Sequence, residues 1–260
     1  MVIVYTFVAL LACLFGSMTG MGGGVIMKPV MDLLGNFDAA TIGVLSSATV
    51  LAMSTFSCVK QLCSKRRFPW KNVILLGLGS VAGGYVGQVL FDLLKASVGA
   101  DHIIKLVQNI VLAVMIIVIF FYMLRKDRIP GLHLEKSIWF ILTGIALGIF
   151  SSFLGIGGGP INVAALTFLF GFDVKISVMG SLVTIFFAQC SKLLTVLFTT
   201  GFQCYDFTVL PYMIVAAIVG AMVGGFINKK INGHATVILF NSMQLVIFGL
   251  CILNIVMLFV

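Results

Sequence analysis

Eight long apolar blocks make up most of this 260-residue chain. They cover about residues 2–34, 39–60, 72–94, 103–124, 137–170, 174–200, 207–228 and 235–259. Most of the blocks are near the roughly 20 residues that an α-helix needs to cross a bilayer. Only helices can fill them, because the backbone groups of an open strand would stay unpaired in lipid. We therefore predict an all-α polytopic membrane protein.

The composition excludes several classes of protein. Hydrophobic residues make up 61% of the chain and charged residues 9%, whereas a soluble domain carries about 25% charged residues. This excludes soluble enzymes and disordered tails. The net charge is +8, but the cations stand in short connectors, as membrane topology requires. We expect the lipid bilayer as a partner, no nucleic acid, and a multi-pass location in the cell (inner) membrane.

Two of the blocks exceed thirty residues, and each is interrupted by three consecutive glycines. The first interruption, SMTGMGGGVIMKP, contains Gly22, Gly23 and Gly24. The second, SSFLGIGGGPINV, contains Gly157, Gly158 and Gly159. A continuous helix through three glycines would be weak. Each long block is therefore predicted to form two half-helices that meet at a glycine turn.

The two interruptions also indicate an internal duplication. The triple glycines are 135 positions apart, and the same spacing relates Phe37-Asp38 to Phe172-Asp173. A spacing of 137 relates Gly83 and Gly87 to Gly220 and Gly224. Repeats of this kind are typical of transporters. We predict a first repeat over residues 1–124, a connecting loop over 125–136 and a second repeat over 137–260.

The distribution of Lys and Arg favours an inverted arrangement of the two repeats. If every block crosses the membrane once, the connector cations divide 9 to 5 between the two sides. If each glycine-broken block enters and returns on one side, one repeat is inverted and the division becomes 12 to 2, which obeys the positive-inside rule better. The twelve are Lys60, Lys65, Arg66, Arg67, Lys71, Arg125, Lys126, Arg128, Lys136, Lys175, Lys229 and Lys230.

The glycine turns suggest a site for a small anion. A helix that begins inside the membrane presents free N–H groups and the positive end of its dipole. Two such turns at mid-membrane would surround an anion from both sides. The alternative is that glycine only permits close helix packing. We favour binding for the triple glycines, and packing for the glycines spaced four apart, which are Gly79, Gly83, Gly87, Gly220 and Gly224.

Polar side chains near the turns could replace the water around an oxyanion. They are Ser17, Thr19, Ser151, Ser152 and Asn162, with Ser47 and Thr184 in the helices that follow. For any single hydroxyl, a bond to its own helix is the commoner use. Lys28 follows the first turn by about one helical turn and could attract the same anion or extend to the interface. For Lys192, extension to the interface is the favoured interpretation.

Enzyme chemistry finds little support in the sequence. The carboxylates are peripheral, the six cysteines form no CxxC pair, and neither HExxH nor GxSxG occurs. We expect no enzyme activity, no metal and no cofactor. The alternatives to a transporter are an anion channel and, less favoured, an intramembrane enzyme.

The motifs GMGGGVIMKPVM and GIGGGPINVAAL, one in each half, resemble the sulfite exporter TauE/SafE family of membrane permeases. The resemblance covers essentially the whole chain. It implies alternating-access transport of sulfite, thiosulfate or an organosulfonate such as sulfoacetate, coupled to a proton or sodium gradient. A homodimer is left open. The second motif departs from the family pattern, because Pro160 follows the glycines directly.

Overall fold

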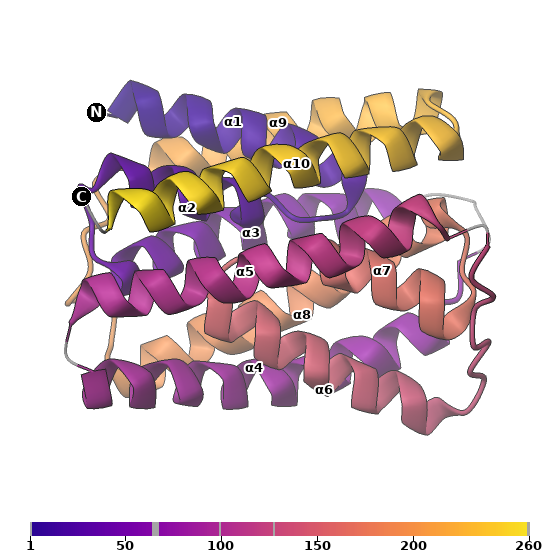
Figure 1. Cartoon of the computed structure of the whole chain (residues 1–260), viewed down its shortest axis with the longest axis horizontal. Coiled ribbons are helices and arrows are strands. Elements are labelled where there is room, and N and C mark those ends of the chain that lie inside the picture. Colours follow the sequence, from indigo (N-terminus) through magenta and orange to yellow (C-terminus); the bar gives the residue numbers. More distant parts are fainter. Residues whose placement is uncertain (1, 64–67, 99, 127, 259–260) are drawn as a thin grey trace.

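The computed structural model describes residues 2–63, 68–98, 100–126 and 128–258, and this part of the chain is all-helical (Figure 1). Eight of its helices are long and apolar enough to cross a membrane, so the prediction of a multi-pass all-α protein is confirmed. Each predicted block corresponds to one helix or one broken pair of helices. The helices are α1 (Val2–Thr19), α2 (Gly24–Leu34), α3 (Ala39–Leu62), α4 (Trp70–Val98), α5 (Asp101–Leu124), α6 (Ser137–Leu154), α7 (Gly159–Phe170), α8 (Val174–Thr199), α9 (Leu210–Lys230) and α10 (Gly233–Met257).

Both predicted helix breaks are confirmed, but the two turns differ in shape. The first turn separates α1 from α2, and Gly22 has a φ of 75° while Gly23 keeps a helical φ of −65°. In the second turn, between α6 and α7, the φ of Gly158 is 103°. Positive φ is costly for residues with a Cβ. Pro160 lies in the first turn of α7, where its missing N–H costs no hydrogen bond.

The helices α1 and α2 form a hairpin that opens at one end of the molecule. Asn36, just after α2, donates a 2.8 Å hydrogen bond to the hydroxyl of Tyr5 near the start of α1. The backbone N–H of Ala39 donates to Asp101 at 2.8 Å, so α3 and α5 begin at this same end. Figure 1 shows both termini there. We call it the terminal end.

The helices α6 and α7 form a second hairpin that opens at the opposite end. The backbone N–H of Leu132, in the segment before α6, donates to the carbonyl of Phe168 near the end of α7 at 2.8 Å. Lys175 at the start of α8 donates to the carbonyl of Ile231 after α9 at 2.9 Å. We call this the connector end.

Three of the twelve cations discussed above, Lys65, Arg66 and Arg67, lie outside the described residues.

Glycine stripes hold the two hairpins against the rest of the bundle. On α4, a Cβ added to Gly83 would lie 2.0 Å from the carbonyl oxygen of Ile145 on α6. On α9, a Cβ added to Gly224 would lie 2.2 Å from the carbonyl oxygen of Leu14 on α1. The packing role predicted for these glycines is confirmed. The same crowding occurs at Gly79, Gly87 and Gly220.

Candidate functional site

The two glycine turns meet inside the bundle. A Cβ added to Gly24 would lie 2.3 Å from the carbonyl oxygen of Ile156, and one added to Gly22 would lie 3.4 Å from that of Gly157. At Gly24 the two turns approach too closely to admit a side chain. In the described part of the chain, none of the hydrogen bonds uses the N–H of Gly22, Gly23 or Gly24.

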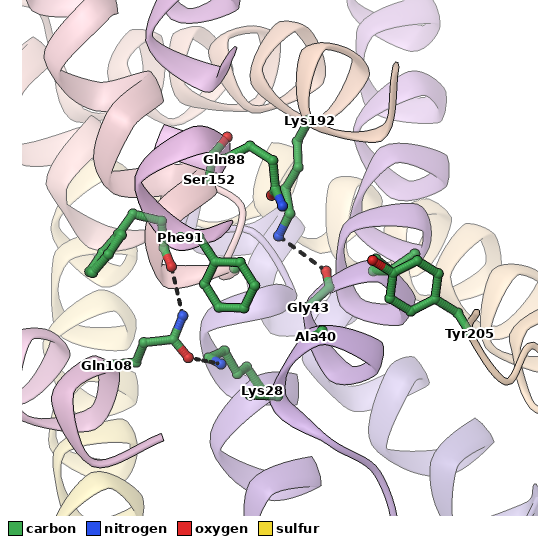
Figure 2. Close-up of a pocket in the computed structure, with 13 residues that line it drawn as sticks. Lys28, Ala40, Gly43, Gln88, Phe91, Gln108, Ser152, Lys192 and Tyr205 are labelled. Carbon is green, nitrogen blue, oxygen red and sulfur yellow. Dashed lines mark hydrogen bonds between the residues drawn. The ribbon is translucent and has the colours of Figure 1, made fainter. Parts of the chain in front are cut away.

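A small cavity lies beside these turns, on the side of the terminal end. Figure 2 shows the residues that line it. Its free volume of about 10 Å³ has room for about one water molecule. Residues from both halves line it. Of the residues predicted from sequence, Lys28 and Ser152 belong to the lining. Those outside the lining are Ser17, Thr19, Gly22, Gly23, Gly24, Ser47, Ser151, Gly157, Gly158, Gly159, Asn162 and Thr184.

Lys28 reaches the cavity from the short helix α2. Its side chain is buried, with 3% of its surface exposed. The Nζ atom donates a 2.6 Å hydrogen bond to Oε1 of Gln108 on α5, and Nε2 of Gln108 donates to the carbonyl of Phe153 on α6, also at 2.6 Å. The chain of bonds is visible in Figure 2. It fixes the ammonium in the interior instead of at an interface.

Lys192 reaches the same cavity from α8. Its side chain is 4% exposed, and Nζ donates to the carbonyl of Gly43 on α3 at 3.3 Å. The interpretation that this lysine extends to the interface is therefore wrong. The helix packs against α3 and α4, and the side chain is buried between them.

The two lysines converge on Gly155, the residue that ends α6. A Cβ added to Gly155 would lie 3.4 Å from Nζ of Lys192 and 3.8 Å from Cδ of Lys28. Among the described residues, neither lysine has a carboxylate within 4.0 Å. Buried cations are normally paired, because burial removes their hydration. In the described part of the chain the lining therefore holds two ammonium groups and no carboxylate, which suits an anion.

Neutral polar groups complete the lining. The hydroxyl of Ser152 and Oε1 of Gln88 are buried and have no hydrogen-bond partner among the described residues. Such groups are uncommon in protein interiors. The Ser152 hydroxyl is thus free to donate to an oxygen of a bound anion.

Most of the other predicted hydroxyls bond to their own helices. Ser17 donates to Leu14 at 3.0 Å, Thr19 to Phe15 at 2.8 Å, Ser47 to Gly43 at 2.6 Å and Thr184 to Gly180 at 2.9 Å. The prediction that such hydroxyls hydrogen-bond to their own helix is confirmed for these four. Ser151 instead accepts a 3.2 Å hydrogen bond from Gln189, and Oδ1 of Asn162 has no partner in the described chain.

The sequence reasoning missed the glutamines Gln88 and Gln108. Both are buried, with 3% and 2% of their surfaces exposed, and both stand in apolar helices. An amide in the middle of an apolar span is costly unless it has a partner. Because of this cost, glutamines are uncommon in such spans, and their presence there is the signal that could have identified both residues.

Comparison with known proteins agrees with this architecture. The family model described as "Sulfite exporter TauE/SafE" matches residues 5–250. A curated relative from Methanocaldococcus jannaschii, named "Probable membrane transporter protein MJ0441", is 24% identical over 232 residues, which cover 84% of this chain and 83% of that protein. No solved structure matches the chain. With the family model covering nearly its whole length, the chain is a multi-pass membrane transporter that belongs to the sulfite exporter TauE/SafE family.

Proposed function

We propose that the protein carries a small sulfur-containing anion across the cell (inner) membrane and binds it between Lys28 and Lys192. Sulfite, thiosulfate and an organosulfonate such as sulfoacetate are the candidate substrates. The observation that supports this most strongly is the pair of buried ammonium groups that share one cavity without a carboxylate within 4.0 Å in the described chain. An anion supplies the missing negative charge.

The donors around the cavity suit an oxyanion. Two ammonium groups and the Ser152 hydroxyl can each direct a proton to a different oxygen of a sulfite or sulfonate group. Charge-assisted bonds of this kind are shorter and stronger than neutral ones. The free N–H groups of Gly22, Gly23 and Gly24, with those of Gly157, Gly158 and Gly159, are a second set of donors next to the cavity. In our proposal they contact the anion when the helices rearrange during transport.

Alternating access between inverted repeats is the mechanism we propose. Residues 1–124 and 137–260 would be the repeats and residues 125–136 the link. Two observations support this: the hairpins open at opposite ends of the molecule, and the cavity has room for about one water molecule. A cavity this small requires movement before the anion can enter, which favours a carrier over a channel. Coupling to a proton or sodium gradient completes the cycle, and no chemical conversion of the substrate is involved.

Transport into proteoliposomes tests this function. We expect saturable uptake of labelled sulfite, thiosulfate or sulfoacetate that responds to an ion gradient. The variants Lys28→Gln and Lys192→Gln should lose binding and transport, each by about 10-fold or more, as expected when a hydrogen bond to a charged group is lost. Lys95→Gln is the matched control, because Lys95 lies at the same end, is 49% exposed and pairs with Asp38 at 3.8 Å.

Binding is measured separately by the rise in melting temperature on adding each anion, since a ligand that binds only the folded protein stabilises it. Flux that does not saturate and ignores gradients would identify a channel. Undiminished transport in both lysine variants would exclude the site.

A further inference from the structure

A second small cavity lies on the side of the connector end. The residues that matter in its lining are Ser17 on α1, Ser57 and Lys60 on α3, and Gly225 and Lys229 on α9. Its free volume is about 20 Å³. Like the first cavity it holds two lysines and at least one serine.

Four residues in the lining of the second cavity stand at positions that correspond to lining residues of the first. The spacings that relate the two halves of the sequence, 135 and 137, also relate the two linings. The corresponding pairs are Ser17 with Ser152, Ser57 with Lys192, Met179 with Val44 and Gly225 with Gln88. The first cavity lies toward the terminal end and the second toward the connector end.

The two linings differ in where they place their cations. In the first cavity Lys192 itself occupies the corresponding position on α8. In the second, Ser57 occupies that position on α3, and Lys60 follows it by about one helical turn. Lys229 likewise follows Gly225 by about one turn on α9. Lys60 is thus displaced from the position of Lys192 by about one helical turn toward the connector end, whereas Lys229 corresponds to no lysine of the first cavity.

Lys60 is directed over the backbone of α9. Its Nζ donates to the carbonyl of Met222 at 3.5 Å, and a Cβ added to Gly225 would lie 3.2 Å from Nζ. Within the described residues neither Lys60 nor Lys229 has a carboxylate within 4.0 Å. The positive-inside rule accounts for lysines at this end. It does not account for an ammonium that lies above a glycine in a cavity.

We propose that this cavity is a second binding site for the same oxyanion, at which the anion pauses between the Lys28 and Lys192 site and the solution at the connector end. This inference rests on the proposed function. The site is weaker than the first, because its lysines lie nearer to water, where charges interact less strongly. The second site raises the local concentration of the anion at the connector end, as a charged cleft does.

The test compares entry from the two ends in proteoliposomes that hold the protein in one orientation. Lys60→Gln and Lys229→Gln should each raise KM for the anion entering from the connector end by about 3- to 10-fold at low salt, since such focusing is screened by salt. KM for entry from the terminal end and the thermal shift caused by the anion should stay as in the wild type.

Lys230→Gln is the matched control. It removes the same charge from the same end of α9, but Lys230 lies outside this cavity with its Nζ 4.5 Å from the ring centroid of Phe226. Lys60→Arg keeps the positive charge and changes the length of the side chain, so it should give the KM of the wild type if charge determines the effect. An equal rise in KM for Lys230→Gln, or equal rises at both ends, would show a general surface effect and overturn the inference. An absence of transport by the wild type would instead refute the proposed function.

Discussion

The ammonium of Lys28 is held at 2.6 Å by the neutral amide of Gln108. Both side chains are buried, with 3% and 2% exposed. An amide oxygen orients the ammonium but does not neutralise it, so the positive charge remains available to a ligand. A carboxylate in the same place would form a closed ion pair. This choice of acceptor makes Lys28 suitable for binding a substrate.

The variant Gln108→Glu should therefore prevent anion binding. It places a carboxylate against Lys28, which neutralises the charge that the substrate requires. We expect the affinity to fall by about 10-fold or more, the usual cost of losing a charged hydrogen bond, as measured by ligand-induced thermal shift. Gln244→Glu is the control, because Gln244 is fully buried on α10, away from the cavity. That variant should lose stability but keep its affinity, and wild-type affinity in Gln108→Glu would remove Lys28 from the site.

A methyl group on the α4 stripe should destabilise the fold. In Gly83→Ala the new Cβ meets the carbonyl of Ile145, so α4 and α6 must separate, at a cost of about 1–3 kcal/mol. In Gly249→Ala, within α10, the Cβ meets nothing within 4 Å. There the higher helix propensity of alanine should add up to about 1 kcal/mol. Melting temperatures in detergent should therefore move in opposite directions, and equal shifts would contradict the packing role of Gly83.

The second glycine turn should tolerate a side chain less well than an open turn does. At Gly201, with a φ of 71° and no atom within 4 Å of an added Cβ, alanine should cost only the backbone strain of about 1–2 kcal/mol. At Gly158 the φ is 103° and the Cβ would lie 2.4 Å from Nδ2 of Asn162. Gly158→Ala should therefore destabilise the protein more than Gly201→Ala in thermal denaturation. The reverse order would show that the turn is not crowded.

The loop between α8 and α9 should loosen at low pH. The hydroxyl of Thr208 at 2.5 Å, and its backbone N–H at 2.9 Å, donate to Asp206 and hold the pKa of that carboxyl below its usual value. A lowered pKa in the folded state stabilises the loop above the ordinary pKa of aspartate, and the stabilisation is lost as the pH falls through the lowered value. Thr208→Val should raise the pKa of Asp206, measured by carbon NMR of the carboxyl. An unchanged value would contradict the role of the hydroxyl.

Much of the fold was predictable because the bilayer restricts the possibilities so strongly. The length and hydropathy of the blocks predicted the helices to within a few residues, and three successive glycines predicted both breaks. The four-residue spacing of Gly79, Gly83 and Gly87 predicted a helix contact, since glycine lets two backbones approach. Each of these inferences concerns local sequence.

The lining of the cavity was less predictable. In a membrane protein both the lipid-facing and the inward faces of a helix are apolar, so hydrophobic periodicity does not show which way Gln88, Gln108 or Lys192 points. Lys28 was identified because it follows a glycine turn by one helical turn. Lys192 has no such marker, and only the packing of α8 among α3 and α4 shows that its side chain is enclosed.

The glycine stripes have a consequence for biosynthesis. The face of α4 that contains Gly83 contacts α6, and the face of α1 beside Gly224 contacts α9. When a ribosome has delivered α1 to α5 into the bilayer, these surfaces still lack the helices that cover them. The glycine faces of the first half therefore stay exposed to lipid until the second half is inserted. Either half made alone would leave these faces uncovered, where they could pair with other membrane helices or be recognised by the proteases that remove unassembled proteins.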